Sequence, residues 1–425
     1  MSNSPGLARL MRHPGFVPLW AAAGLSTLGT SISALAFQLL MIEVLRANQF
    51  EIGLVRSAQW LPCLLFGLFA GVVADRIYRK LLLIGADVVS GLLMLTIAVL
   101  ALTGGLSIGL LAAFAFLLGC VVVLYGGAFQ SLTADLLPPD LLTAGNVVQT
   151  QTYTAAVTTG PMISGIVVRL FGAPLAIAID AFSYLGSAFF LWRMPGVNQQ
   201  RLGTASIVTS VREGLTWVYH HRTLAPYALA LHAWFIGNNI AGVVYIYHGI
   251  AIGLDSVAIG VTLACAGITG VFGAALAGPI SKKIGLGLAV PLCDFLAGGA
   301  WLLVAVVPAG GTAFAALCIA QLLYGFGLGI QDPLTMSYRN AVTPSRLRGR
   351  MNTTIRSFNW GLIAIAAPLG GWLALHFGDQ LALAIGGAIM IAAGTALILS
   401  PYRSAVMPEH PDGGPQASAS AKPLA

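Results

Sequence analysis

Four aspartates lie inside long apolar stretches of this sequence, where an ionised side chain is costly. They are Asp87, Asp180, Asp294 and Asp332. Carboxylates in such surroundings usually pair with a neighbour or carry a function such as proton binding. Asp87 and Asp294 suit a structural role as acceptors of hydrogen bonds, and Asp180 suits either packing against a hydroxyl or proton binding. All four are candidates for a group that takes up and releases a proton.

A cluster of charges interrupts the apolar sequence at residues 71–80, GVVADRIYRK. Asp75, Arg76, Arg79 and Lys80 place four formal charges in a chain that is only 8% charged. Lysine and arginine at the inner ends of membrane spans fix the orientation of a chain, whereas acidic residues contribute little. A topological anchor therefore explains the three cations but does not explain Asp75.

The elements that must position these residues are membrane-spanning helices. The chain has 425 residues, is 57% hydrophobic and has a mean hydropathy of +0.87, which exceeds what the core of a water-soluble fold requires. A spanning helix needs roughly 20 mostly apolar residues. The sequence has twelve such stretches, at 16–42, 52–74, 81–102, 107–130, 147–170, 174–192, 224–249, 256–280, 286–307, 311–334, 353–375 and 381–400. It predicts an all-α membrane protein with twelve transmembrane helices.

The basic residues are distributed unevenly between the two sides that these spans define. With the N-terminus in the cytoplasm, 18 of the 21 lysines and arginines fall in inner segments, and only Arg46, Arg56 and Arg169 lie near the outer face. This bias predicts a multi-pass protein of a bacterial inner membrane with both termini cytoplasmic. The net charge of +7 then reflects topology, and the expected partner is the lipid bilayer and not nucleic acid.

The longest polar interruption divides the chain into two parts. We predict a six-helix half at 1–193, a cytoplasmic linker at 194–222, a second six-helix half at 223–400 and a disordered cytoplasmic tail at 401–425. In the linker, apolar residues at helical spacing, among them Val211 and Val218, predict an amphipathic helix on the inner membrane surface.

An internal repeat relates the two halves. At an offset of 207 residues, GVVADRIY at 71 corresponds to GPISKKIG at 278, Asp87 to Asp294, and Pro161 to Pro368. The offset covers an even number of spans, so the halves share one orientation and should be related by a pseudo-two-fold axis along the membrane normal. We expect the substrate site between them.

The sequence argues against catalytic and metal chemistry. All five cysteines lie inside predicted spans without paired spacing. The sequence has no H-E-x-x-H motif, no G-x-x-x-x-G-K-[ST] motif and no paired histidine cluster. We therefore expect no enzyme activity, no cofactor and no metal site.

The charged loop resembles the signature loop of the major facilitator superfamily, G-x-x-x-D-R-x-G-R-K. The residues that match are Gly71, Asp75, Arg76, Arg79 and Lys80, and Tyr78 replaces the expected glycine. The resemblance implies a transporter that works by alternating access, in which this loop latches the two halves together in the outward-facing state. The alternative is a loop that only anchors the topology.

A second stretch, TTGPMISG, resembles the exporter motif of the same superfamily and matches it at Gly160, Pro161 and Gly165. The resemblance implies a hinge in the fifth span, because proline removes a helix hydrogen bond and small residues let a neighbouring helix approach. Ordinary helix packing is the alternative.

Longer stretches, such as ADLLPPDLLTAGN and VTPSRLRGRMN, resemble bacterial exporters of the third drug/proton antiporter group, which includes macrolide and enterobactin efflux proteins. Relatives with a carboxylate in the tenth span use it in coupling, so the resemblance favours Asp332 as the proton carrier. Many relatives carry an arginine where this chain has Ser90, so proton relay through that arginine is not expected.

Polar and aromatic residues within the spans are candidates for the substrate cavity, because an amphipathic ligand needs stacking and a few hydrogen bonds. They are Gln38, Tyr125, Gln149, Trp234, Asn238, Asn239, Tyr324, Asn359 and Trp360. The alternative for each is a hydrogen bond between helices or a place in an interfacial aromatic belt.

Together these features predict a secondary active transporter that acts as a monomer and uses protons to export a small amphipathic compound, such as a drug, an antibiotic or a siderophore. Two alternatives stay open, namely uptake of a nutrient or metabolite and a membrane sensor that transports nothing.

Overall fold

Long helices make up nearly the whole structure. The computed structural model describes residues 5–196 and 207–407, without the side chains of residues 5, 6, 68–76, 207, 208 and 210. The first helices are α1 (Pro5–Met11), α2 (Phe16–Leu39, continued by the π-helical turn Leu40–Val44), α3 (Gln49–Arg76), α4 (Arg79–Thr103), α5 (Ile108–Leu136), α6 (Pro139–Phe171) and α7 (Ala173–Arg193). The others are α8 (Ile207–His220), α9 (Leu224–Ala251), α10 (Ser256–Ile284), α11 (Leu286–Val306), α12 (Ala313–Val342), α13 (Ser345–Phe377) and α14 (Asp379–Leu399).

Each predicted span coincides with a helix. Eleven helices in the described part of the chain are long and apolar enough to cross a membrane. The remaining predicted span, 52–74, lies in α3, which has 28 residues but is not one of the eleven, so a count of twelve spans stays a prediction. α6 and α13 begin eight residues before the predicted spans, because polar sequence after Pro138 and Pro344 continues the helix beyond the apolar stretch.

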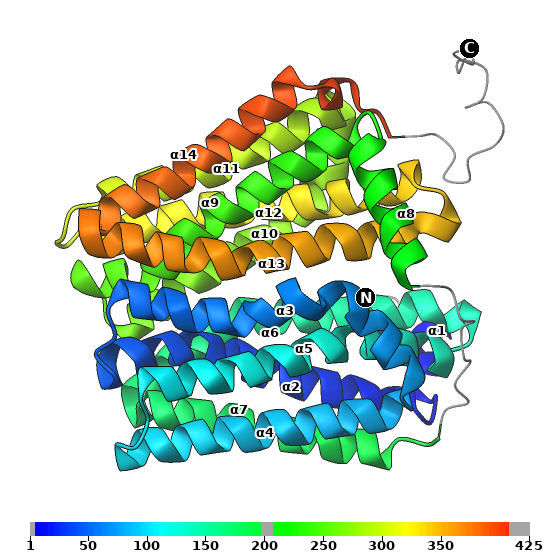
Figure 1. Ribbon diagram of the computed structural model, residues 1–425, viewed down its shortest axis with the longest axis horizontal. Helices are drawn as coiled ribbons and strands as arrows, with labels where there is room; N and C mark the ends of the chain where they lie inside the picture. The colour runs from blue at the N-terminus through cyan, green and yellow to red at the C-terminus, as the bar shows by residue number, and fades with distance from the viewer. Residues whose placement is uncertain (1–4, 197–206, 408–425) are drawn as a thin grey trace.

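The helices form two groups, which lie as two layers in Figure 1. In the first group α2 packs against α6 and α7, α3 against α5, and α4 against α5 and α7. The same pairings recur in the second group, where α9 packs against α13 and α14, α10 against α12, and α11 against α12 and α14. The groups meet mainly where α3 packs against α13 and α6 against α10.

The predicted repeat reappears in the packing between the groups. A Cβ atom on Gly260 would lie 2.4 Å from the carbonyl oxygen of Pro161, and one on Gly53 would lie 2.8 Å from Cα of Pro368. Only glycine permits such close approach of two helices. Gly260 follows Gly53 by the predicted offset of 207 residues, and Pro368 follows Pro161 by the same offset. The two close contacts are therefore equivalent under the internal repeat.

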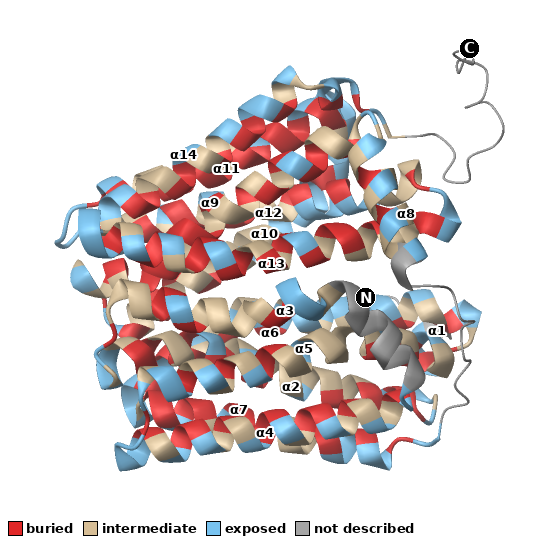
Figure 2. Ribbon diagram, viewed as in Figure 1, coloured by how far each residue is buried: buried red, intermediate tan, exposed pale blue. Residues whose placement is uncertain are grey.

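Large apolar side chains cover the outside of the bundle. Leu81, Phe182 and Trp192, on α4 and α7, are each more than 60% exposed, and exposed residues alternate with buried ones along these helices (Figure 2). Exposed apolar surface on this scale is untypical of a water-soluble protein but suits helices whose outer faces contact lipid.

The linker helix α8 lies across one end of the second group (Figure 1). Val218 is fully buried in a cluster with Met351 and Ile355 of α13, and the indole nitrogen of Trp217 donates to Oγ1 of Thr343 at 3.1 Å. The sequence predicts that this apolar face lies on the membrane surface. At Val218 the face packs against the protein, because α13 extends beyond its apolar stretch and offers apolar surface there.

The predicted disordered tail begins too early at residue 401. Pro401–Ser404 form a 3-10 turn, and Tyr402 is fully buried between the rings of Tyr227 and Tyr338. The prediction is therefore wrong for these residues, because burial of one aromatic ring fixes the chain after α14. Residues 408–425 lie outside the described residues.

Candidate functional site

A cavity of about 750 Å³ lies between the two groups of helices. Its walls come from α9, α12 and α13, with Gln130 of α5 from the opposite group. The predicted cavity residues Trp234, Asn238, Asn359 and Trp360 line it. The volume falls in the range typical of sites for small molecules.

The charged groups of this central cavity are one carboxylate and two guanidinium groups. Asp332 and Arg339 come from α12, and Arg356 comes from α13. The guanidinium carbon of Arg356 lies 5.4 Å from the ring centre of Trp360, an arrangement that allows a cation–π interaction. Among the described residues, neither arginine forms an ion pair, and the Asp332 carboxylate accepts no hydrogen bond. Arg339 and Arg356 were not among the predicted site residues, although an arginine within an apolar span is a signal that sequence reasoning can use.

A polar network holds two of the cavity amides. Asn238 Oδ1 accepts from the hydroxyl of Tyr324 at 2.8 Å and from the indole nitrogen of Trp301 at 3.3 Å. Asn359 Oδ1 lies 2.6 Å from Nδ1 of His232. Tyr324 therefore positions Asn238 and does not itself line the central cavity.

A second, smaller cavity of about 480 Å³ lies within the first group of helices. The predicted residues Tyr125 and Asp87 line it, together with Tyr184 and hydroxyl-bearing residues of α2. Trp360 lines both cavities. Three further predicted residues, Gln38, Gln149 and Asn239, line neither of these two cavities.

The other three candidate aspartates are buried and hydrogen-bonded. Asp87 accepts from the hydroxyl of Ser187 at 2.5 Å, and Asp180 accepts from Ser33 at 2.5 Å. Asp294 accepts from Nε2 of Gln331 at 2.7 Å. Each carboxylate joins two helices, as expected for a structural role, although Asp87 also lines the smaller cavity.

The charged loop is described only in part, because the side chains of Gly71, Asp75 and Arg76 lie outside the described residues. Arg79 donates to the carboxylate of Asp135 on α5 and is almost fully buried. Lys80 donates to the backbone oxygens of Trp192 at 3.2 Å and Met194 at 2.5 Å. These two cations therefore connect helices of the first group.

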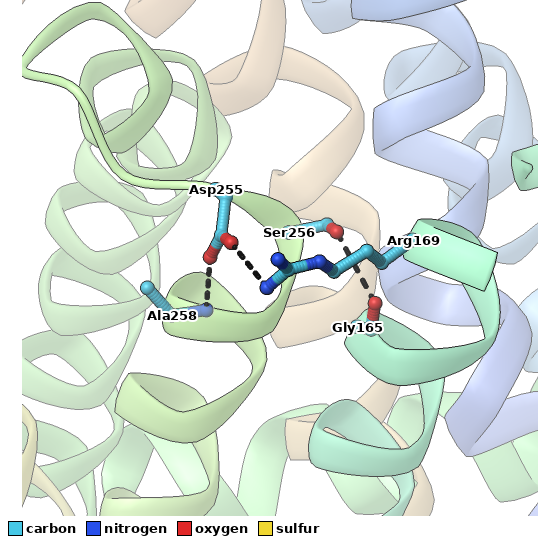
Figure 3. Close-up of polar contacts among 5 residues, drawn as sticks. All are labelled: Gly165, Arg169, Asp255, Ser256 and Ala258. Atoms are coloured by element: carbon cyan, nitrogen blue, oxygen red, sulfur yellow. Dashed lines mark hydrogen bonds and ion pairs between the residues drawn. The ribbon is translucent and has the colours of Figure 1, made fainter.

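The exporter-like motif of α6 contacts one helix of its own group and one helix of the other group. A Cβ atom on Gly160 would lie 2.4 Å from Cβ of Ser31 in α2, whereas one on Gly165 would lie 2.4 Å from the backbone oxygen of Ser256. Figure 3 shows that Oγ of Ser256 donates to the backbone oxygen of Gly165, at 3.1 Å, and that Arg169 pairs with Asp255 at 3.0 Å. These contacts join α6 to the start of α10 at the end of the bundle that the sequence predicts to be outer.

The pair α3 and α13 closes the same end. Oγ of Ser57 in α3 donates to the backbone oxygen of Ala364 in α13 at 2.5 Å, and Nε2 of Gln49 donates to Asp379, the first residue of α14, at 3.0 Å. Further along, Trp60 and Trp360 contact each other with ring centres 5.4 Å apart. At the opposite end, the central cavity reaches Gly349 and Asn352, in the first two turns of α13.

Solved transporters share this fold. A mutant of the nucleoside transporter NupG superposes with a TM-score of 0.76 over 90% of this chain and 99% of its own, at 11% identity. A bacterial homologue of the iron transporter ferroportin, in an inward-facing state, gives 0.72 over 92% and 98%, at 16% identity. At such low identities the likeness establishes the fold alone.

Sequence comparison identifies the family. The chain is 24% identical over 375 residues to an uncharacterized MFS-type transporter, y4rN, of Sinorhizobium fredii, covering 85% of this chain and 89% of the relative. It is also 24% identical over 226 residues to the uncharacterized MFS-type transporter YkuC of Bacillus subtilis, covering 51% and 52%. The model of a family described as transmembrane secretion effectors matches residues 5–412. The chain therefore belongs to this family of MFS-type membrane transporters.

Proposed function

We propose that the protein is a proton-coupled secondary transporter that exports a small amphipathic compound by alternating access. The observation that carries this proposal is the central cavity between the two groups of helices, which contains the carboxylate of Asp332 and is separated from the predicted outer face by contacts between the groups. Two six-helix halves related by a two-fold axis, with both termini cytoplasmic, would rock about this cavity.

The structure has the features expected of an inward-facing state. Contacts of α6 with α10 and of α3 with α13 hold the predicted outer ends together, and the cavity extends toward the predicted cytoplasmic ends. A compound entering from the cytoplasm would meet Trp234 and Trp360, which offer apolar area, and Asn238, which offers a hydrogen bond. Opening of the outer contacts would then release it outside.

Asp332 is the proposed proton carrier because its chemical environment differs from that of the other aspartates. Asp87, Asp180 and Asp294 accept hydrogen bonds from neighbouring helices. Asp332 lies on the cavity wall and makes no such bond with the described residues. It would take a proton from the outer side when the cavity opens outward and release it to the cytoplasm in the state seen here, so that proton and compound move in opposite directions.

Flux in proteoliposomes tests this proposal. With an acidic lumen, wild-type protein should concentrate at least one of three probes: neutral N-phenyl-1-naphthylamine, anionic 1-anilinonaphthalene-8-sulfonate or cationic tetraphenylphosphonium. Asp332→Asn should lose concentrative uptake, down to the level of protein-free liposomes, but keep downhill exchange, because it can bind compound yet carries no proton. Asp140→Asn, at a carboxylate whose side chain is 55% exposed, serves as the matched control.

Three outcomes would count against parts of the proposal. Gradient-driven movement in the opposite direction would favour import, and absence of flux for every probe would favour a sensor. Uptake by Asp332→Asn that keeps the pH dependence of the wild type would remove Asp332 as the proton carrier.

A further inference from the structure

The central cavity contains more positive than negative charge. Arg339 and Arg356 face it together with a single carboxylate, Asp332. In the described part of the structure, Nε of Arg339 is buried without a hydrogen-bond partner, and its Nη2 donates to the weak acceptor Sδ of Met336 at 3.0 Å. The residue as a whole is half-buried, so the rest of its guanidinium group is accessible from the cavity. The cavity therefore has unsatisfied capacity to bind an anion.

Neighbouring arginines of the same region have protein partners. Arg350 donates to the carboxylate of Glu213 in α8, and Nε of Arg348 donates to the backbone oxygens of Asn340 and Thr343 at 2.9 and 3.1 Å. Within the described part of the chain, Arg356 contacts the ring of Trp360 and forms no ion pair. The contrast separates arginines that hold the cytoplasmic ends of the helices together from one that faces the cavity.

Topology does not explain why Arg356 faces the central cavity. Retention of cations on the cytoplasmic side accounts for Arg339, which lies one turn from the end of α12. Arg356 lies three positions after the start of the predicted apolar span 353–375, and its side chain lines the central cavity. A cation within an apolar span that faces a cavity usually marks the path of a substrate or ion.

A third arginine lies on the other side of the tryptophan pair. Trp60 and Trp360 contact each other across the two groups, with Arg356 one turn before Trp360 in α13 and Arg56 one turn before Trp60 in α3. Because the helices run in opposite directions, the two arginines flank the pair, each about 6 Å away along its helix. Among the described residues, Arg56 donates to Oδ1 of Asn239 at 3.4 Å, and its buried Nε has no hydrogen-bond partner.

We propose that the transported compound carries an anionic group, such as a carboxylate or sulfonate, which binds Arg356 and Arg339 in the inward-facing state and Arg56 after the Trp60–Trp360 contact opens. The apolar part of the compound stacks on Trp360 and Trp234. Guanidinium groups bind such anions through charge-assisted hydrogen bonds. This inference rests on the proposed transport function but concerns binding, so it can be tested without flux.

The test compares two probes that share an aromatic scaffold and differ in charge. Binding of anionic 1-anilinonaphthalene-8-sulfonate and neutral N-phenyl-1-naphthylamine to the purified full-length protein is followed by energy transfer from tryptophan. Arg356→Gln should weaken binding of the anion about tenfold or more, which is the effect of losing a charged hydrogen bond. Binding of the neutral probe should stay within about twofold, and Arg356→Lys should recover part of the loss. Arg9→Gln, at an arginine whose side chain is 65% exposed, is the control.

The variants separate failure of this inference from failure of the transport proposal. Equal binding of the anion by wild type and Arg356→Gln would overturn the anionic site even if the protein transports, whereas selective loss would support it even if no probe is pumped. Arg56→Gln should leave binding unchanged and slow transport of the anion. Equal weakening of binding by Arg56→Gln and Arg356→Gln would overturn the proposed order of the two sites.

Discussion

Replacing Asp135 with alanine is expected to destabilise the first group of helices by about 3–5 kcal/mol. The side chain of its partner Arg79 is only 3% exposed, and the pair joins α4 to α5. The variant would remove the carboxylate that Asp135 supplies to a buried guanidinium group, which costs more than loss of an exposed ion pair. Thermal unfolding of the detergent-solubilised protein, followed as loss of its monodisperse gel-filtration peak, measures the effect.

The exposed pair between Arg9 and Asp140 provides the control. Its side chains are 65% and 55% exposed, so Asp140→Ala should cost about 1 kcal/mol or less. The double variant Arg79→Leu/Asp135→Leu should recover part of the stability, because it removes both charges from the buried site. If Asp135→Ala is as stable as the wild-type protein, the ion pair between Arg79 and Asp135 has no structural role. Transport lost without any loss of stability would favour the latch that the sequence motif implies for Arg79.

Replacing Gly165 with leucine is expected to shift the protein toward its outward-open state. A Cβ atom at this position would lie 2.4 Å from the backbone oxygen of Ser256, so α6 and α10 must separate where the outer ends now touch. Overpacking of this kind costs about 1–3 kcal/mol, enough to move a two-state equilibrium by roughly tenfold to a hundredfold. Spin labels at Arg169→Cys and Asp255→Cys, two exposed positions of this contact, report the separation.

A lipid-facing glycine provides the comparison. Gly85 of α4 is exposed, and a Cβ atom on it would have no neighbouring atom within 4 Å, so Gly85→Leu should leave the label distances unchanged. If the distances between the spin labels increase in Gly165→Leu while the unfolding temperature stays unchanged, the close approach at Gly165 holds the outer ends of α6 and α10 together. Unchanged distances would mean that the α6–α10 contact does not limit opening.

The class of fold follows from the amino-acid sequence alone. Apolar stretches of about 20 residues have one stable form in a bilayer, the helix, because every backbone polar group must be satisfied within the segment. For the same reason each predicted span coincides with a helix, and the predicted starts agree with the observed ones at Phe16, Leu224 and Leu286. The offset of 207 residues also reappears in the contacts of Pro161 and Pro368.

Which polar residue faces which neighbour depends on the tertiary structure. Asn238 and Asn239 are adjacent in sequence and were predicted alike, yet Asn238 lines the cavity and Asn239 contacts Arg56 at the interface between the groups. Successive residues of a helix point about 100° apart, so the rotation of each helix about its axis assigns such residues to cavity, interface or lipid. In a uniformly apolar helix the sequence contains little indication of that rotation. Packing against other helices fixes this rotation. Packing also brings Asp135 next to Arg79, although the two residues are 56 positions apart in the sequence.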